Sequence, residues 1–350
     1  MRAVVLVGGE GTRLRPLTET IKKELLPLMD RAVLHHTLDH LSRHGVHEVI
    51  LSSSYLEDTF RSFIEARRGD PTMTWITETE PLGTGGAIVN ALASVGTGEP
   101  FLALNGDIVT DLDVTAMVAT HRTRGAAATI ALAHVDDARA FGLVATQADG
   151  RVMEFREKPQ EPVPGDINAG TYVLEPSALS RWDPGSLSIE RDVFPALIAE
   201  GLPVYGFSSD AYWIDLGTPE KYLQAHFDML DGKVGSAPHY ATPFVADSAA
   251  VHERARLGRR AVVCAGARIE RDAVVDDSVV HPHAVVEEGA TVRSSILGPR
   301  SRVGAGAVVN RSVLAEGAAV PAGVPLDDAR VSAGQVAAST ERTGASDRMG

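Results

Sequence analysis

The chain has 350 residues, of which 44% are hydrophobic and 23% are charged. This composition is ordinary for a globular protein, and the length is large for one domain, so we expect two packed units. The formal net charge of −13 argues against a nucleic-acid partner, because proteins that bind duplexes present a basic face. The sequence contains no apolar run long enough for a bilayer, and its first apolar run is too short for a signal peptide. The single cysteine, Cys264, rules out an internal disulfide and favours a cytoplasmic protein.

Up to residue 231 the chain alternates short apolar runs with helical patterns. Three of the runs predict strands, at residues 3–7, 46–53 and 101–105. Leu34, Leu38 and Leu41 would share one face of a helix. A second helix is expected to begin after the glycines of 83–86 and to run over residues 87–93. This alternation predicts an α/β fold with a doubly wound, mostly parallel sheet and helices on both faces. Three later strands, near residues 141–146, 151–157 and 167–174, lack intervening helices and predict an antiparallel insertion beside that sheet.

The remaining sequence has a different period. Aliphatic residues recur at intervals of six, and the frame slips by one at Ser278, Ser295 and Ser312, which are seventeen residues apart. The inward positions of this pattern are Val245, Val251, Leu257, Val263, Ile269, Val275, Val280, Val286, Val292, Leu297, Val303, Val309, Leu314 and Val320. Such a period predicts a left-handed parallel β-helix of hexapeptide repeats over residues 244–325, preceded by a linker at 232–243. Residues 326–350 are expected to form a flexible tail. Cys264 lies beside an inward valine and is expected to be a packed residue rather than a reactive thiol.

A glycine-rich segment at residues 4–18, VVLVGGEGTRLRPLT, follows the first predicted strand. Glycines allow backbone amides to approach an anion closely. The segment lacks the Lys-Ser/Thr of a Walker A loop, and Leu14 stands where a dinucleotide fingerprint needs a small residue. Arg13, Arg15, Lys22 and Lys23 add a cationic cluster to an acidic chain. Because arginine and lysine are suited to phosphate oxygens, this cluster favours a phosphate-binding loop over a solvated surface turn.

The same segment resembles the signature of the sugar-1-phosphate nucleotidyltransferase family, GGxGTRLRPLT, which is followed by a lysine within a Pro-Lys-Pro context. Counting from Thr18 places that lysine at Lys23. This chain departs from the pattern by having Lys22 and Glu24 where the family usually has prolines. The departure retains the lysine but weakens the expectation of a rigid surrounding, and Glu24 would lower the local positive potential.

Further matches to this family follow in order along the chain. Residues 80–86, EPLGTGG, resemble the nucleotide-binding stretch of the GDP-mannose pyrophosphorylase branch. The sequences NGD at 105–107, EKP at 157–159 and NAG at 168–170 resemble its metal and sugar-phosphate elements, and WIDLGTP at 213–219 resembles its second metal-binding motif. The resemblance covers residues 1–231 and implies a Rossmann-like catalytic domain there. The hexapeptide region matches a common C-terminal appendage of the family.

The resemblance assigns roles to individual residues. Asp107 and Asp215 would hold Mg²⁺, Arg13 would clasp the β- and γ-phosphates, and Lys23 would lie near the α-phosphate, which makes these two cations the catalytic candidates. The implied nucleotide-binding residues are Leu6, Gly8, Gly9, Gly11, Thr12, Arg13, Lys23, Pro81, Gly83, Thr84 and Gly106. The implied sugar-phosphate-binding residues are Asn105, Gly142, Glu157, Lys158 and Asn168. A sugar phosphate attacks with an oxygen that is already unprotonated, so the chemistry needs alignment and charge neutralisation rather than a general base. Taken singly, Asp107 could cap a turn, Asp215 could cap the helix near Pro219, and Lys158 could be a turn residue.

The predicted activity joins a nucleoside triphosphate to a sugar-1-phosphate and releases pyrophosphate, with GTP and mannose-1-phosphate favoured. Alternatives are a modified sugar or cyclitol phosphate such as valienol-1-phosphate as acceptor, or thymidylyl or uridylyl transfer. A non-catalytic regulatory subunit is disfavoured because Arg13, Lys23, Asp107 and Asp215 are all present. An acyltransferase is disfavoured because the repeat region offers few coils. We expect the β-helix to serve oligomerisation of identical subunits or support of the catalytic domain, with no membrane partner.

Overall fold

The computed structural model describes residues 1–53, 58–78, 80–96 and 98–337. The chain forms two compact units, and neither is a single continuous stretch. The first unit comprises Met1–Gly9 and Val33–Asp215, and the second comprises Glu10–Ala32 together with the chain from Leu216 onward. Residues 10–32, which carry most of the glycine-rich loop and its cations, therefore fold with the C-terminal part of the sequence.

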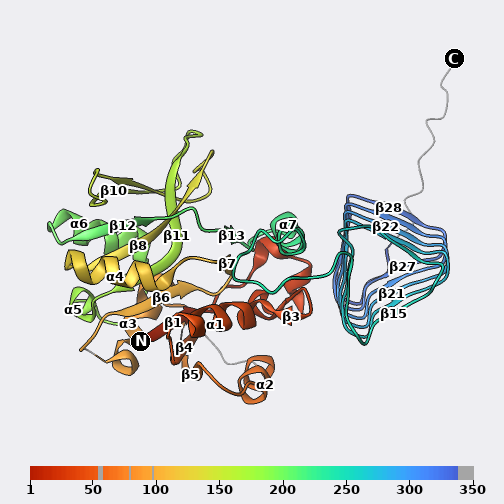
Figure 1. Cartoon of the computed structure of the whole chain (residues 1–350), viewed down its shortest axis with the longest axis horizontal. Helices are drawn as coiled ribbons and strands as arrows, with labels where there is room; N and C mark the ends of the chain where they lie inside the picture. Colours follow the sequence, from red (N-terminus) through yellow and green to blue (C-terminus); the bar gives the residue numbers. More distant parts are fainter. Residues whose placement is uncertain (54–57, 79, 97, 338–350) are drawn as a thin grey trace. The chain divides into compact units, whose positions relative to one another are not determined.

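The first unit is built on a sheet of nine strands in which β10, β9, β11, β6, β1, β4 and β5 follow one another, while β8 joins β11 to β12. Pairs β1–β4, β1–β6, β4–β5 and β8–β12 are parallel, whereas β6, β8 and β9 pair antiparallel with β11. The strands span β1 Arg2–Leu6, β4 Glu48–Ser53, β5 Thr72–Thr77, β6 Phe101–Asn105, β8 Ala128–Val135, β9 Gly142–Thr146, β10 Val152–Glu157, β11 Gly165–Leu174 and β12 Val204–Ser208. The predicted α/β class is confirmed, and the strands near 141–146, 151–157 and 167–174 form its antiparallel part (Figure 1).

The helices described in the first unit are α1 Val33–Arg43, α2 Asp58–Ala66, α3 Gly83–Val95, α4 Val114–Arg124, α5 Pro176–Leu179 and α6 Phe194–Ala199, with a π-helical turn at Ile189–Val193. Helix α3 packs against β1 and β4, and α4 packs against β8, β11 and β12. In α1 the predicted inward residues Leu34, Leu38 and Leu41 are fully buried. Strands β7 Ile108–Thr110 and β13 Trp213–Asp215 form a separate two-stranded ribbon.

Helix α3 corrects one prediction. We expected the helix to begin after the glycines of 83–86, but it begins at Gly83 and includes them. A Cβ on Gly83 would lie 2.7 Å from the carbonyl oxygen of Leu187, and one on Gly86 would lie 2.0 Å from that of Gly185. The glycines therefore let the segment 185–189 pack directly on the first turn of the helix, where Gly85 and Gly86 both donate N–H groups to the carbonyl of Leu187.

The second unit contains the segment 10–32, helix α7 Pro219–Leu230 and three parallel sheets of short strands that form a β-helix (Figure 1). Within 10–32 there are three 3-10 turns, Thr12–Leu14, Leu17–Glu19 and Lys23–Leu25, and the hairpin strands β2 Pro27–Leu28 and β3 Arg31–Ala32. The β-helix strands are β14 Phe244–Val245, β15 Ala250–Val251, β16 Arg256–Leu257, β17 Val262–Val263, β18 Arg268–Ile269, β19 Val274–Asp276, β20 Val279–Val280, β21 Val285–Val286, β22 Thr291–Arg293, β23 Ile296–Leu297, β24 Arg302–Val303, β25 Val308–Asn310, β26 Val313–Leu314, β27 Ala319–Val320, β28 Pro325–Asp327 and β29 Arg330–Val331.

The six-residue pattern correctly predicted the inward positions of the β-helix from Val263 onward. From Val263 to Val320 every predicted residue is buried in its core, whereas Val245 on the first coil is 38% exposed. The seventeen-residue slip has a structural cause in the serines. The N–H of Ser295 donates to the hydroxyl of Ser278 at 3.0 Å, and the N–H of Ser312 donates to that of Ser295 at 3.0 Å. Each serine hydroxyl thus supports the next coil at the corner where one residue is missing.

The end of the β-helix corrects the predicted tail. We placed a flexible tail from residue 326, but β28 and β29 continue the coils and bury Leu326 and Val331 in the core. Residues 338–350 of that tail lie outside the described residues. Cys264 is fully buried, and burial raises the pKa of its thiol, which fits the packed residue that we expected.

Candidate active site

A cavity of about 220 Å³ lies in the first unit at the carboxyl ends of β1, β4 and β5. Its lining residues are Leu6, Gly8, Gly9, Ser52, Glu78, Pro81, Gly83, Thr84 and Ala87. Six of these were predicted to bind nucleotide, so the structure gathers sequence positions 6–9 and 81–84 around one cavity. Carboxyl ends of parallel strands are where doubly wound folds place ligands. The sequence motifs did not identify the other three lining residues, Ser52, Glu78 and Ala87, as part of the site.

Glu78 is the charged residue in the lining of this cavity, and only 6% of it is exposed. Its Oε1 accepts a hydrogen bond from the Ser52 hydroxyl at 3.0 Å, and its Oε2 accepts one from the Leu82 N–H at 3.2 Å. A carboxylate has about four acceptor positions, so two remain for a ligand. The sequence offers one signal for Ser52 and Glu78 as site residues, which is that each stands at the carboxyl end of a strand.

Thr84 lines the same cavity, but its hydroxyl bonds within the protein. The hydroxyl donates to Glu190 Oε2 at 2.7 Å and accepts the Ile189 N–H at 3.1 Å. Thr84 therefore shapes the cavity wall through its fixed side chain. Gly106, another predicted nucleotide-binding residue, donates its N–H to the Leu6 carbonyl at 2.9 Å and so joins the end of β6 to the end of β1.

The predicted sugar-phosphate residues Gly142 and Glu157 face each other in the pairing of β9 with β10. A Cβ on Gly142 would lie 2.9 Å from Glu157 Oε2 and 2.7 Å from the Phe155 ring, so only glycine leaves room for this carboxylate. Lys158 follows with a φ of 49° and donates its N–H to the Phe141 carbonyl at 2.9 Å. Its Nζ lies 3.4 Å from Glu157 Oε1. The side chain of Lys158 is 65% exposed, which leaves the ammonium accessible to an anion.

Asn168 lies at an irregularity of β11, where the register against β8 shifts between Asn168 and Tyr172. Its Nδ2 donates to the Tyr172 hydroxyl at 2.8 Å, and its Oδ1 accepts the Gly170 N–H at 2.9 Å. A Cβ on Gly170 would lie 2.7 Å from Asn105 Nδ2, so Asn105 is a neighbour of this irregular stretch. The pairing of Ile167 with Leu143 connects it to the strand of Gly142. The structure thus brings the predicted sugar-phosphate residues to one region of the first unit.

The two predicted metal ligands come from neighbouring strands. Asp215 pairs with Ile108, the residue that follows Asp107, so the register of β13 against β7 places the two aspartates near each other in the ribbon. The Trp213 indole N–H donates to the Ala169 carbonyl at 2.9 Å and joins this ribbon to β11. Helix α7 is capped by Thr218, which leaves Asp215 without the alternative role of helix cap.

These aspartates fit a hard divalent cation that completes its coordination with substrate oxygens and water. In the described residues no group of three or more histidine, cysteine, aspartate or glutamate side chains is arranged to hold a metal by itself. Mg²⁺ characteristically binds through one or two carboxylates plus phosphate oxygens and water. The donor set of Asp107 and Asp215 therefore matches a site that forms together with bound nucleotide.

The cationic residues predicted to bind the triphosphate, Arg13 and Lys23, belong to the second unit. Gly11 has a φ of 63°, and its carbonyl accepts the Thr18 hydroxyl at 2.7 Å, which closes the loop that contains Thr12 and the exposed Arg13. Lys23 begins a 3-10 turn, and its side chain is 16% exposed. Glu24, which stands at a usual proline position, is fully buried with Oε1 3.8 Å from Lys23 Nζ. The departure from the family pattern therefore places a carboxylate beside the predicted phosphate-binding lysine.

Residues 10–32 are held by the β-helix and α7 of the same unit. Arg330 donates to the Arg15 carbonyl at 3.1 Å, and the Ser332 hydroxyl and Ala333 N–H donate to the Glu19 carboxylate at 3.0 and 2.8 Å. The Cys264 thiol donates to the Met29 carbonyl at 2.9 Å.

A buried pair of aromatic residues adds to this attachment. The Tyr222 hydroxyl donates to the Pro27 carbonyl and lies 2.9 Å from His281 Nε2. Burial lowers the pKa of His281 to about 3, so this histidine stays neutral and can donate from Nε2 to the tyrosine oxygen.

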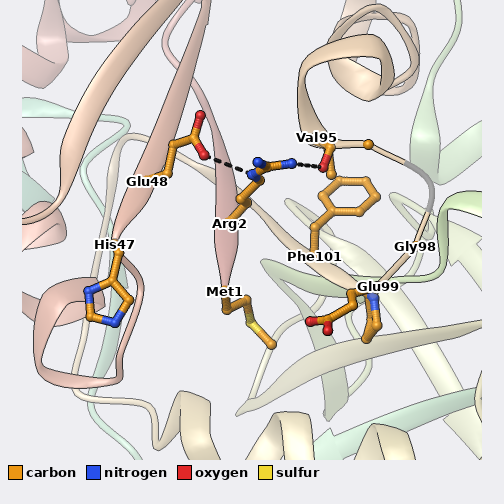
Figure 2. Close-up of a pocket in the computed structure, with 10 residues that line it drawn as sticks. Met1, Arg2, His47, Glu48, Val95, Gly98, Glu99 and Phe101 are labelled. Atoms are coloured by element: carbon orange, nitrogen blue, oxygen red, sulfur yellow. Dashed lines mark hydrogen bonds and ion pairs between the residues drawn. The ribbon is translucent and has the colours of Figure 1, made fainter.

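A second cavity of the first unit, of about 390 Å³, lies at the amino ends of β1, β4 and β6. Figure 2 shows Arg2 between Glu48 and Val95, with Nε donating to Glu48 Oε2 at 2.7 Å and Nη1 donating to the Val95 carbonyl at 2.5 Å. The guanidinium is thus engaged by the protein itself. No predicted site residue lines this cavity, which lies at the opposite strand ends from the cavity lined by Leu6 and Thr84.

Among the helices that the structure describes, none has the length and apolar character needed to cross a bilayer.

Comparison with known proteins gives a consistent result. The model of the family described as nucleotidyl transferase matches residues 2–232, and the model of the GMPPB C-terminal domain matches residues 240–342. The mannose-1-phosphate guanylyltransferase of Mycobacterium tuberculosis is 38% identical over 288 residues, which cover 79% of each chain. The probable mannose-1-phosphate guanylyltransferase 2 of Arabidopsis thaliana is 36% identical over 296 residues, which cover 81% of this chain and 80% of that one.

A solved structure extends the likeness to the fold. HddC from Yersinia pseudotuberculosis, described as complexed with GMP-PN, superposes with a TM-score of 0.56 at 32% identity and covers 64% of this chain and 97% of its own. The chain therefore belongs to the nucleotidyl transferase family, and it is a sugar-1-phosphate nucleotidyltransferase similar to mannose-1-phosphate guanylyltransferases.

Proposed function

We propose that this enzyme transfers a guanylyl group from GTP to mannose-1-phosphate, forming GDP-mannose and releasing pyrophosphate. The observation that carries the choice of nucleotide is the buried carboxylate of Glu78 in the cavity beside Leu6, Gly8 and Pro81. The cavity is smaller than the roughly 300–1,000 Å³ of sites that enclose a whole drug-sized ligand, so it suits one part of a nucleotide, such as its base.

Guanine is the base whose donors match this carboxylate. Its N1–H and exocyclic amino group are adjacent donors, and a carboxylate accepts two such hydrogen bonds in parallel. Uracil and thymine instead present one N–H between two carbonyl oxygens, which the Glu78 charge would repel. Adenine presents an acceptor at N1. A buried charged acceptor left without its donors costs binding energy, so the wrong base is rejected more strongly than a mere change of shape would allow.

The remaining steps follow from the charges on this chain. The exposed Lys158 would hold the acceptor phosphate, and Glu157 and Asn168 would each bind a sugar hydroxyl. Arg13 and Lys23 would neutralise the triphosphate of the donor. A divalent ion bound by Asp107 and Asp215 would supply Lewis-acid stabilisation of the pyrophosphate leaving group. The acceptor phosphate oxygen attacks the α-phosphorus, the bond from that phosphorus to the β-phosphate oxygen breaks, and no proton needs to be removed.

The mannose acceptor rests on the likeness to mannose-1-phosphate guanylyltransferases, and GMP-PN in the Yersinia protein supports guanine. A modified sugar or a cyclitol phosphate such as valienol-1-phosphate is the competing acceptor, because the described contacts bind phosphate more firmly than they distinguish hydroxyl orientations. A cytoplasmic location and a homo-oligomer stay predictions, and light scattering of the purified protein checks the second.

The test is a pyrophosphate-release assay with magnesium. GTP, ATP, UTP, CTP and dTTP are each combined with mannose-1-phosphate, glucose-1-phosphate and valienol-1-phosphate. We expect the highest kcat/KM for GTP with mannose-1-phosphate and no turnover when the metal is chelated. A preference for UTP or dTTP would contradict the role of Glu78. A preference for valienol-1-phosphate would show that the acceptor is a cyclitol phosphate rather than mannose-1-phosphate. No pyrophosphate release with any pair would favour a non-catalytic regulatory subunit.

A further inference from the structure

Glu190 is a half-buried carboxylate that none of the sequence motifs marks, and it lies in the π-helical turn Ile189–Val193. Its Oε2 accepts hydrogen bonds from the hydroxyls of Thr84 at 2.7 Å and Ser188 at 2.8 Å. The buried Tyr172 hydroxyl lies near Glu190, whose carboxylate helps to keep the phenol protonated. π-helical turns interrupt regular helices and occur often at functional sites. One carboxylate thus connects Thr84 in the nucleotide cavity with strand β11.

The connection continues from Tyr172 to Asn168. Asn168 Nδ2 donates to the Tyr172 hydroxyl at 2.8 Å while Oδ1 accepts the Gly170 N–H at 2.9 Å. These two bonds fix which end of the amide is nitrogen and which is oxygen. One N–H of Nδ2 and one lone pair of Oδ1 remain for a sugar hydroxyl.

The hydrogen bonds in this chain of contacts all have a defined direction. Tyr172 accepts from Asn168, so its own proton is available to the Glu190 carboxylate, which only accepts. Burial raises the pKa of Tyr172 well above its ordinary value, and the nearby Glu190 charge adds to the effect, so the phenol stays protonated and remains a donor. Thr84 accepts the Ile189 N–H, and its proton likewise goes to Glu190. The charge of Glu190 therefore orients groups on both sides.

We propose that Glu190 is a positioning residue that holds Thr84 in the wall of the nucleotide cavity and Asn168 toward the sugar phosphate. This inference rests on the proposed function, because it concerns the two substrates of the same reaction. Glu190 touches neither substrate. It acts through Thr84 for the nucleotide and through Tyr172 and Asn168 for the acceptor.

The central variant is Glu190→Gln, which keeps the size but replaces one acceptor oxygen by a donor. The hydroxyls of Thr84, Ser188 and Tyr172 then direct their protons at an amide that has one acceptor oxygen, so at least one of these hydroxyls must turn away. We expect KM for both GTP and mannose-1-phosphate to rise about tenfold, the effect of one displaced buried hydrogen bond, while kcat changes by less than about threefold.

Two further variants separate the two sides. Thr84→Val removes the hydroxyl on the nucleotide side and is expected to raise KM for GTP alone. Tyr172→Phe removes the contact between Glu190 and Asn168 and is expected to raise KM for mannose-1-phosphate alone. A general loss of packing would not divide the two KM values in this way.

The matched control is Asp192→Asn in the same π-helical turn. Asp192 Oδ2 accepts the Ser188 N–H at 2.7 Å, so this variant disturbs the turn without touching the hydroxyls bound to Glu190. We expect it to lower the thermal midpoint while leaving both KM values within twofold of wild type. Circular dichroism and thermal unfolding of all four variants show which of them fold.

The outcomes are distinct. Unchanged KM values in a folded, active Glu190→Gln enzyme would overturn this inference and leave the proposed function intact, as would equal effects of Thr84→Val and Tyr172→Phe on both substrates. A wild-type enzyme that prefers another nucleotide or sugar phosphate overturns the proposed substrates, and the same comparison is then made with the preferred pair. A wild type without turnover overturns both.

Discussion

Replacing Glu78 by glutamine is expected to change which nucleotide the enzyme prefers. The Leu82 N–H needs an acceptor, so the amide oxygen of glutamine would take the place of Oε2, and the amide nitrogen would take the place of Oε1 beside Ser52. The Ser52 hydroxyl can turn and accept from that nitrogen. Guanine then meets one acceptor and one donor where it met two acceptors.

The size of the effect follows from the loss of one hydrogen bond to a charged group. Such a bond contributes about 1.5–3 kcal/mol, and each 1.36 kcal/mol is a factor of ten, so kcat/KM for GTP should fall roughly 10- to 150-fold. Uracil and thymine pair an N–H and a carbonyl with the amide of glutamine. For UTP and dTTP we therefore expect kcat/KM to rise by about tenfold.

Initial rates of pyrophosphate release, measured for GTP, UTP and dTTP at saturating mannose-1-phosphate, give these values. The control is Glu65→Gln, which changes an exposed glutamate of α2 and should leave the nucleotide preference as in the wild type. If Glu78→Gln keeps kcat/KM for GTP within twofold of the wild-type value, Glu78 does not contact the base and the nucleotide assignment fails.

Three further expectations concern other parts of the molecule. Burial lowers the pKa of His281 from 6.5 to about 3, so the unfolded chain binds a proton at this histidine more readily than the folded chain does. The stability contributed by the neutral histidine is complete above pH 6.5 and is lost as the pH falls toward 3. At pH 5 the free energy of unfolding is lower by about 2 kcal/mol. The drop in thermal midpoint between pH 7 and pH 5 should therefore be smaller in His281→Gln than in wild type, and an equal drop would contradict the argument. Gly142→Ala places a Cβ 2.9 Å from Glu157 Oε2, so KM for mannose-1-phosphate should rise about tenfold with KM for GTP unchanged; steady-state kinetics with each substrate varied decides this. Asp215→Asn and Lys23→Ala should each lower kcat on the order of a hundredfold, through metal binding and phosphate charge respectively, and only Asp215→Asn should regain rate as magnesium is raised.

Local patterns were sufficient for much of the fold. The interval of six fixed the inward residues of the β-helix because each coil repeats the same geometry, and the serine slips marked the corners where a hydroxyl supports the next coil. The heptad-like spacing of leucines placed α1 correctly for a similar reason. Prediction failed where packing between distant segments decides, as at Gly83 and Gly86, whose conformation depends on residues 185–189.

In the candidate site, too, local motifs identified some residues, and contacts between distant segments determined the others. Gly8, Gly9, Pro81 and Thr84 were predicted by motif and line one cavity. Glu78 belongs to no motif that we used, because its role depends on the neighbouring strand that carries Ser52. Glu190 lies more than a hundred residues from Thr84, and a contact over that separation leaves no local pattern in one sequence.

The assignment of residues 10–32 to the second unit limits how this enzyme can be divided or recombined. A fragment that ends near residue 231 would keep the sheet of the first unit but lose Cys264, Arg330 and Ser332, whose contacts hold residues 10–32. It would also lose His281, which contacts Tyr222. Chimeras made by joining the sheet of one relative to the β-helix of another inherit the same difficulty. In a chimera of two relatives, the β-helix and residues 10–32 should therefore come from the same parent.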